Sequence, residues 1–300
     1  MATDRAQLAT FLYSGSDQPG LVAQLAGFFY GLGLNIVDAS NHTDPHAEGG
    51  PRFFMRLVID LAGLSSARAQ AALSGSATRA TMEQKFDEVT RGLTGTWSVG
   101  YSDILPRVAI MVTRDPACLY DLVLRQRQGE LACEIPLVIS NHAALEGVAA
   151  GFRIPFYALP VGPDQKRVQE QQVVELLRKN HIDLVVLARY MQVLTDEFLR
   201  EAPPVINIHH GFLPAFQGGK PYHQAHARGV KLIGATAHYA TKDLDQGPII
   251  EQDVARVTHQ MGPEELVRVG RDVERVVLAR AVRSHLERRV LVEGRRTIVL

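Results

Sequence analysis

Apolar and polar positions along the first hundred residues alternate in a pattern typical of a small mixed domain. Residues 7–14 alternate with period two and predict a strand. The polar, proline-containing residues 16–20 supply capping residues, so we expect a helix over 21–33. Two β-rich runs, 34–42 and 51–60, are separated by a turn-rich segment and predict a hairpin.

A second helix and a last strand complete this N-terminal part. The helix is expected over 80–93 and the strand over 96–102, while residues 63–76, rich in Ala, Ser and Gly, predict an extended loop. The resulting β-α-β-β-α-β order is that of a ferredoxin-like module. We therefore predict a first domain over residues 1–103.

From residue 107 the pattern changes to strands that alternate with helices. Strands are expected over 107–113, 134–140, 154–160 and 182–188, with helices over 116–128, 143–149 and 164–180 between them. Strands that are almost continuously apolar imply a parallel sheet covered on both faces. A proline precedes the new pattern, so the boundary is placed at 103–106 and a second, α/β domain is expected over 107–300.

Composition and charge narrow the function classes. Lys plus Arg and Asp plus Glu number 32 each, so the chain has no net positive charge with which to hold nucleic acid. The first residues lack the basic and then apolar run of a signal peptide, and no membrane-spanning run is present, which predicts a cytoplasmic protein without a membrane partner. Cys118 and Cys133 are expected to be buried thiols rather than a disulfide framework.

Chemistry-bearing side chains gather at the end of a short apolar strand within 204–210. In an open parallel sheet, ligands bind at the carboxyl ends of the strands, which is where Asn207, His209 and His210 fall. Period two places Asn207 and His209 on one face of the strand, with His210 expected to point the other way.

A second polar cluster, with Asp243, Asp245 and Gly247, lies in a loop between two further strand-like runs. An amide, an imidazole and a carboxylate suit acyl or formyl transfer. The amide N–H stabilises oxyanion charge, the imidazole moves a proton, and the carboxylate orients water and the imidazole. This set needs no metal.

Structural readings compete with each of these assignments. Taken singly, the Asn is typical of a turn former, the His of a hydrogen-bonded structural group and the Asp of a turn residue. A metal site is the alternative for His223 and His226, three apart on a predicted helix, together with the histidines at 209, 210 and 238. Gly218, Gly219 and Lys220 do not match a phosphate loop and are read as a plain loop before that helix.

Residues 207–254, with 182–199 upstream and 270–287 downstream, closely resemble the formyltetrahydrofolate deformylases, hydrolytic members of the formyltransferase fold. The resemblance implies a Rossmann-like formyltransferase domain with a mostly parallel sheet. It assigns the catalytic triad to Asn207, His209 and Asp245. One position departs from the pattern, because many relatives have Ser where this chain has Gly211.

The same resemblance implies hydrolysis of 10-formyltetrahydrofolate to tetrahydrofolate and formate, a reaction that supplies formate for purine synthesis and balances the one-carbon pool. Folate is the substrate, and no tightly bound cofactor is expected. The implied substrate-binding residues are Arg189, Met191, Gln192, Leu194, His238, Thr241 and Asp243.

Two alternatives stay open. A transferase of the same fold hands the formyl group to glycinamide ribonucleotide and follows its first strand with a glycine-rich loop that cradles phosphate. Here residues 114–118 have no glycine, Asp115 would repel phosphate and Pro116 lacks an N–H, which favours water as the acceptor. The other alternative is a catalytically silent folate or amino-acid sensor.

Residues 14–42 and 52–60 resemble an ACT domain, an amino-acid-sensing module. This resemblance implies glycine or methionine as effectors, bound near Asp17, Gly20, Asn35 and Asp38, with Asp17 read equally well as a helix cap. Pairing of such modules implies a homo-oligomer, with dimer and tetramer both open.

Overall fold

The protein is described from a computed structural model that covers residues 7–162, 164–215 and 221–300. Two compact units make up the chain: the first extends to Leu105 and includes Arg288–Gly294 and Ile298–Leu300, and the second comprises Pro106–Glu287 and Arg295–Thr297. The segment containing Gly218, Gly219 and Lys220 lies outside the described residues. No helix in the described ranges is both long and apolar enough to cross a bilayer.

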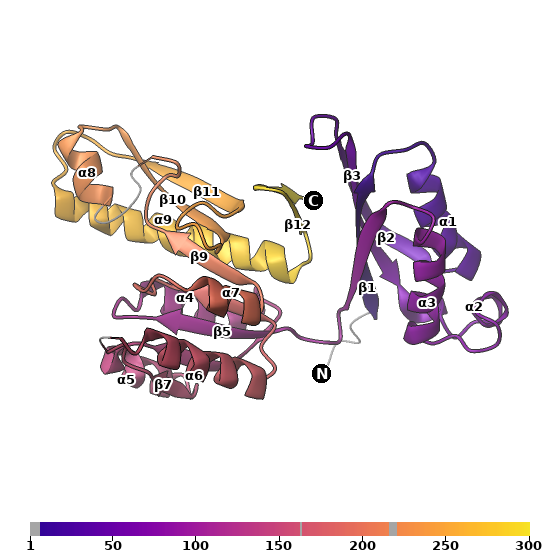
Figure 1. Ribbon diagram of the computed structural model, residues 1–300, viewed down its shortest axis with the longest axis horizontal. Coiled ribbons are helices and arrows are strands. Elements are labelled where there is room, and N and C mark those ends of the chain that lie inside the picture. The colour runs from indigo at the N-terminus through magenta and orange to yellow at the C-terminus, as the bar shows by residue number, and fades with distance from the viewer. Residues whose placement is uncertain (1–6, 163, 216–220) are drawn as a thin grey trace. The chain divides into compact units, whose positions relative to one another are not determined.

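The first unit is built on a four-stranded antiparallel sheet with the order β2-β3-β1-β4 (Figure 1). Its elements are β1 (Leu8–Ser16), α1 (Leu21–Leu32), β2 (Asn35–Asp44), β3 (Arg52–Asp60), η1 (Leu61–Gly63), α2 (Ala67–Ala72), α3 (Arg79–Thr90) and β4 (Gly95–Tyr101). The predicted hairpin is confirmed as β2 and β3, and the predicted strands and helices all lie within a few residues of their expected bounds.

The core of this unit lies between the sheet and helices α1 and α3, which Figure 1 shows on one face of it. Alternate residues of β1 are buried, and Phe11 meets Phe29 of α1 and Phe86 of α3 at ring-centroid distances of 4.8 and 4.9 Å. Aromatic side chains that meet at these distances and angles stabilise a core beyond the area they bury. The residues that the strand pattern and the helix patterns predict to be buried therefore meet in one aromatic cluster.

Two local predictions in this unit are wrong. The segment 63–76 was expected to be an extended loop, but it contains α2, because its alanines favour helix and the Ser66 hydroxyl caps it by accepting from Ala69 N at 3.2 Å. Helix α1 was expected to begin with a side-chain cap, but its first boundary residue is Gly20, at φ 89°, and no side chain caps it.

The second unit contains a seven-stranded sheet with the order β11-β10-β9-β8-β5-β6-β7. Its strands are β5 (Arg107–Val112), β6 (Glu134–Ser140), β7 (Phe156–Ala158), β8 (Leu184–Leu187), β9 (Val205–His209), β10 (Leu232–Tyr239) and β11 (Ile249–Arg256). Strands β7, β6, β5, β8 and β9 are parallel, and β10 runs antiparallel to both of its neighbours. The predicted mostly parallel α/β sheet is confirmed.

Helices cover both faces of this sheet, as the continuous apolar runs of β5 and β8 predict (Figure 1). They are α4 (Ala117–Arg127), η2 (Ala143–Leu145), α5 (Glu146–Gly151), α6 (Lys166–Lys179), α7 (Asp196–Glu201), α8 (Pro221–Ala227) and α9 (Pro263–Leu286). Side chains of α6 and α7 pack against one face, and α9 packs against β9, β10, α4 and α8 on the other. The chain ends in a small pair of strands, β12 (Val290–Glu293) and β13 (Arg296–Val299).

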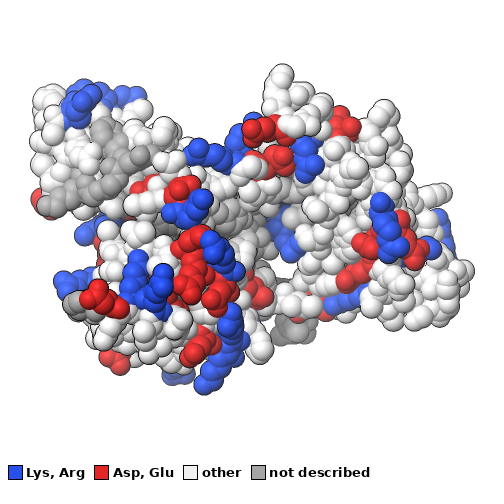
Figure 2. Space-filling model, viewed as in Figure 1, with Lys and Arg blue, Asp and Glu red and all other residues white. Residues whose placement is uncertain are grey.

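Charged side chains of both signs are interspersed on the face drawn in Figure 2. This mixture is what equal numbers of acidic and basic residues predict.

Candidate active site

The carboxyl ends of β8 and β9 open onto a cavity of about 270 Å³ in the second unit. Asn207 and His209 come from β9, His238 comes from the neighbouring antiparallel strand β10, and Asp245 comes from the loop between β10 and β11. The register pairs Asn207 with His238. The sheet therefore brings together side chains that lie up to 38 positions apart in the sequence.

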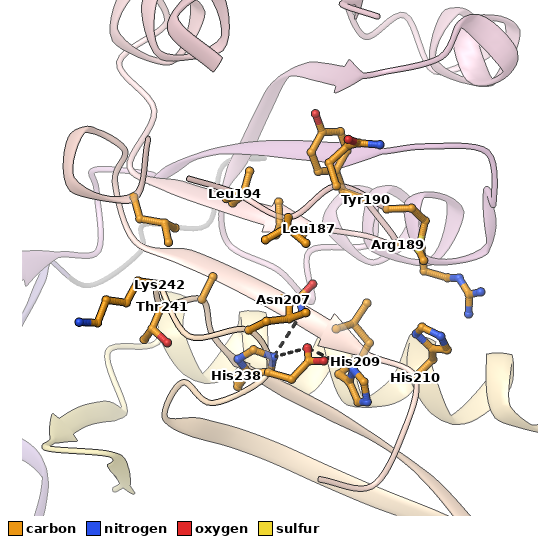
Figure 3. A pocket seen from close by; sticks show the side chains of 18 residues that line it. Leu187, Arg189, Tyr190, Leu194, Asn207, His209, His210, His238, Thr241 and Lys242 are labelled. Carbon is orange, nitrogen blue, oxygen red and sulfur yellow. Dashed lines mark hydrogen bonds and ion pairs between the residues drawn. The ribbon is translucent and has the colours of Figure 1, made fainter. Parts of the chain in front are cut away.

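The central contact joins an imidazole and a carboxylate (Figure 3). His209 Nδ1 lies 3.2 Å from Asp245 Oδ1, and the two side chains are only 4% and 9% exposed. Burial alone would raise the pKa of Asp245, but the hydrogen bond from His209 and the nearby His238 and His210 bring it below its ordinary value. Asp245 is therefore an ionised acceptor, and the proton of His209 resides on Nδ1.

The other ring nitrogen of His209 has no such partner. Nε2 is buried and makes no hydrogen bond to any of the described residues. Buried polar atoms normally have a hydrogen-bond partner, so an orphaned one beside a cavity suits a ligand. With the proton on Nδ1, this nitrogen is free to accept a proton or, once protonated, to donate it.

His238 fixes the amide of Asn207. Its Nδ1 lies 2.9 Å from the carbonyl oxygen of Tyr239, which can only accept, so Nδ1 carries the proton. Burial lowers the pKa of His238, which keeps the ring neutral and leaves Nε2 as an acceptor. Asn207 Nδ2 donates to this nitrogen at 3.3 Å, so the second N–H and the oxygen of the amide stay available.

The segment that follows β8 forms one wall of the cavity. Arg189 has the left-handed φ of 61°, Tyr190 is buried against Gln169, and Met191 N donates to Thr113 Oγ1 at 2.9 Å. The expected binding residues that line the cavity are Arg189, Met191, Gln192, Leu194, His238 and Thr241.

Asp243 does not line the cavity. Its side chain is exposed, and its backbone oxygen accepts from Thr241 Oγ1 at 3.1 Å and from Gln246 N at 3.2 Å. Asp243 thus shapes the loop that carries Asp245.

His210 was expected to face away from Asn207 and His209, and this prediction is wrong. Strand β9 ends at His209, so the alternation of side chains stops there and His210 also lines the cavity. Its ring centroid lies 5.4 Å from that of His209. Burial, together with the charge of Arg189, lowers the pKa of His210 to about 4, so the ring is neutral at neutral pH.

Several further lining residues were not named individually from the sequence, although five of them fall within the stretches 189–194 and 238–245 that the family resemblance assigns to folate binding. These further residues are Leu187, Tyr190, Val193, Leu199, Ile208, Ala240, Lys242 and Leu244. Most are apolar, which gives the cavity walls suited to a planar, largely apolar ring.

The two helix histidines of the alternative metal reading do not join the three histidines of the cavity. His223 and His226 are both exposed on α8 and are absent from the cavity lining. Across the described ranges, no group of three or more His, Cys, Asp or Glu side chains has the geometry to hold a metal ion.

The N-terminal candidates all belong to the first unit. Asp17 is exposed, and its backbone N donates to Pro51 O at 2.9 Å. Asn35 is the first residue of β2, and Asp38 is exposed and forms an ion pair of 2.5 Å with Arg56. Gly20 precedes α1 with a left-handed φ.

Known proteins are similar in sequence to this chain over most of its length. Residues 106–282 match the formyl transferase family. A formyltetrahydrofolate deformylase from Synechocystis is 49% identical over 97% of this chain and 98% of its own length.

Solved structures of a deformylase and of a transformylase are similar to this chain. The crystal structure of a formyltetrahydrofolate deformylase from Pseudomonas syringae superposes with a TM-score of 0.90 at 42% identity, covering 100% of this chain and 96% of that one. A glycinamide ribonucleotide transformylase from Symbiobacterium toebii superposes with a TM-score of 0.62 at 29% identity, covering 65% of this chain and 94% of its own.

Proposed function

This chain belongs to the formyltetrahydrofolate deformylase family, and from that premise we propose that it hydrolyses 10-formyltetrahydrofolate to tetrahydrofolate and formate. The observation that carries the proposal is the buried contact of His209 with Asp245 beside the amide of Asn207, in one cavity. Folate is the substrate in this scheme, and the formate released feeds purine synthesis and balances the one-carbon pool.

Asp245 positions the attacking water. Its Oδ1 is engaged by His209 Nδ1 at 3.2 Å, and its second carboxylate oxygen accepts a hydrogen bond from water next to the formyl carbon. Because the pKa of Asp245 is lowered, the carboxylate stays ionised and able to accept the proton as the water oxygen bonds to carbon.

Asn207 and His209 stabilise the tetrahedral intermediate. The free N–H of Asn207 donates to the oxyanion, and the fixed bond to His238 holds the amide in the orientation that this requires. His209 assists the proton transfer that ends on N10 of the folate. The bond from that nitrogen to carbon then breaks, and formate leaves.

The folate lies along the apolar wall in this proposal. Figure 3 shows Leu187 and Leu194 above Asn207, with Thr241 and Lys242 at one end of the cavity. Backbone groups of the segment from Arg189 to Leu194 meet the pterin ring, and Lys242 at the exposed end suits the anionic glutamyl tail.

Water is the acceptor that the first loop of the unit favours. The loop after β5 places a carboxylate where a transferase would hold phosphate: Asp115 Oδ1 accepts from Ala117 N at 3.0 Å, and its Oδ2 lies 3.2 Å from Arg271 Nε. A carboxylate that already accepts from the backbone N–H of Ala117, the first residue of α4, competes with phosphate for that N–H group. Transfer to an amine acceptor such as glycinamide ribonucleotide is the alternative function.

The test follows formate and tetrahydrofolate from 10-formyltetrahydrofolate, with and without glycinamide ribonucleotide. We expect formate in the absence of the acceptor and a loss of at least about 100-fold in Asp245→Asn. Formylated acceptor as the sole product would make the protein a transferase. No turnover with a folded protein would favour the sensor.

We further propose that the first unit is an ACT domain that pairs in a homo-oligomer and binds glycine or methionine near Asp17, Gly20, Asn35 and Asp38. The support is the antiparallel sheet with helices on one face and two edge strands, β2 and β4. Calorimetry with each amino acid tests this regulatory role, and an absence of heat for both would refute it.

A further inference from the structure

Arg189 stands at the end of the cavity opposite Thr241 and Lys242. In Figure 3 its guanidinium lies beyond Asn207 on the same side as His210, whereas Thr241 and Lys242 lie on the other side. The side chain is 18% exposed, and its backbone has the left-handed φ of 61° that bulky residues seldom adopt. A strained, charged residue at the wall of a reactive cavity calls for an explanation.

Two segments far apart in the sequence pair with this side chain, and a third holds one of its partners. Arg189 Nη1 lies 2.6 Å from Glu274 Oε2 on α9, and Tyr222 of α8 donates to the other oxygen of Glu274 at 2.7 Å. Arg189 Nε lies 3.7 Å from Asp115 in the loop after β5. We call Asp115, Arg189, Tyr222 and Glu274 the acceptor-side cluster.

A contribution to folding stability does not by itself explain why these buried side chains are charged. Glu274 is 1% exposed, and buried ions are costly to desolvate even when paired, so apolar side chains would fill the same space at least as well. Burial tends to lower the pKa of Arg189, but Glu274 outweighs this effect and raises it, so the guanidinium stays charged. The cluster thus holds a charged guanidinium in a fixed position at the wall of the cavity.

The cluster also lacks the charge that a phosphate-bearing acceptor needs. Within the cluster, Asp115 and Glu274 outnumber Arg189, and Arg271, which pairs with Asp115 from outside the cluster, only brings the net charge of the group to zero. In a transferase of this fold, the loop that contains Asp115 would cradle phosphate. Here Asp115 lies within ion-pair distance of Arg189, which lines the cavity beside the reactive residues.

We propose that the acceptor-side cluster closes the route by which an amine would reach the formyl carbon, and that Arg189 is the residue that restricts the acceptor to water. This inference rests on the proposed hydrolysis. The folate occupies the apolar wall and the Lys242 end, so a second substrate larger than water must enter from the Arg189 end. The guanidinium, held by Glu274 and Asp115, fills that entrance.

The test is a partition experiment with Arg189→Gly. Glycine accepts the positive φ without strain, so the variant removes the side chain and preserves the backbone. Wild type and variant are given 10-formyltetrahydrofolate with increasing concentrations of glycinamide, a small amine without phosphate. The ratio of formylated amine to formate is measured by mass spectrometry, with Asp245→Asn added to the variant to give the uncatalysed background.

We expect wild type to yield formate at every amine concentration and Arg189→Gly to raise the ratio of formylated amine to formate at least about tenfold. Arg271→Ala is the matched control, because it removes another ion pair of Asp115 without lining the cavity, and it should keep the wild-type ratio. An Arg189→Gly protein that still releases formate with an unchanged ratio would overturn the proposal.

A second variant covers the case in which Arg189→Gly does not fold. Glu274→Gln keeps an acceptor for Tyr222 but removes the charge that holds Arg189, so the ratio should rise by a smaller factor. A wild-type ratio in this variant would also overturn the proposal. Failure of the proposed hydrolysis is distinguished from both, since it would appear as absent formate release by wild type without amine.

Discussion

Substitution of Gly247 by Ala should disrupt the site without replacing any of the side chains to which we assign a role in the reaction. A Cβ at this position would lie 1.7 Å from the carbonyl oxygen of Tyr239, whereas real contacts of this kind essentially never fall below 3.0 Å. The two backbone segments would therefore have to separate by 1.3 Å or more. Because neither atom belongs to a flexible side chain, we expect the free energy of unfolding to fall by about 3 kcal/mol, the upper end of the usual overpacking cost.

The same displacement reaches the amide of Asn207, to which we assign stabilisation of the oxyanion. The Tyr239 oxygen accepts from His238 Nδ1 at 2.9 Å, and His238 Nε2 in turn accepts from Asn207 at 3.3 Å. Moving the oxygen releases His238 and leaves the amide of Asn207 free to rotate. A misplacement of about 1 Å at a reacting group costs roughly 100-fold in rate, and we expect kcat/KM for formate release to fall by that factor.

Urea unfolding followed by circular dichroism, together with a formate-release assay, measures both effects. Gly147→Ala is the matched control, because that glycine lies within α5 and a Cβ there meets no atom within 4 Å. The control should be as stable as wild type or more stable by up to about 1 kcal/mol, with unchanged activity. A Gly247→Ala protein with wild-type stability and activity would refute this account of how His238 and Asn207 are held.

Three further outcomes are expected. The pKa of His210 is about 4 in the folded protein and near 6.5 in the unfolded one. The neutral ring therefore contributes its full stabilisation above pH 6.5, and this stabilisation is lost as the pH falls towards 4. When the free energy of unfolding is measured from pH 7 to pH 4, His210→Gln should lose up to roughly 3 kcal/mol less than wild type. Lys242→Ala should raise KM several-fold, by roughly 1 kcal/mol of lost ion pairing, for a polyglutamylated substrate and less for the monoglutamate, with kcat unchanged in steady-state assays. Cys118 and Cys133 are buried thiols whose pKa values are raised by burial, so a thiol reagent should label them in the native protein only at the rate of unfolding.

Most of the fold could be predicted from the sequence, because its elements are strongly periodic. The alternation that buries Phe11 and the helical spacing that buries Phe29 are each visible in a window of ten residues. Helix α2 was missed because its stretch of Ala, Arg and Gln has no apolar stripe, so only the helix propensity of alanine and the cap at Ser66 mark it. The cap of α1 was mispredicted because a left-handed glycine at that boundary leaves no place for a side-chain cap.

The cavity lining was harder to predict than the elements. Asn207 and His209 share a strand face, so a local rule brings them together, but the same rule fails for His210 because the strand ends one residue earlier. Lys242 and Leu244 lie in the loop that carries Asp245, and whether their side chains meet the cavity depends on how that loop folds over β9. No spacing rule describes an irregular loop.

Glu274 shows that a signal for the acceptor-side cluster was present in the sequence. The buried stripe of α9 runs through Leu266, Gly270, Glu274, Val277 and Ala281, so a carboxylate stands where helical periodicity demands an apolar residue. A buried carboxylate requires a cation or several donors, and a partner must therefore come from another segment. The pattern could not indicate that this partner is Arg189, 85 positions earlier, because nothing local links α9 to the end of β8. A charge inside an apolar stripe thus predicts a buried ion pair. Because this ion pair lies beside the carboxyl ends of the strands that carry the reactive residues, we expect it to control which acceptor reacts rather than to stabilise the fold.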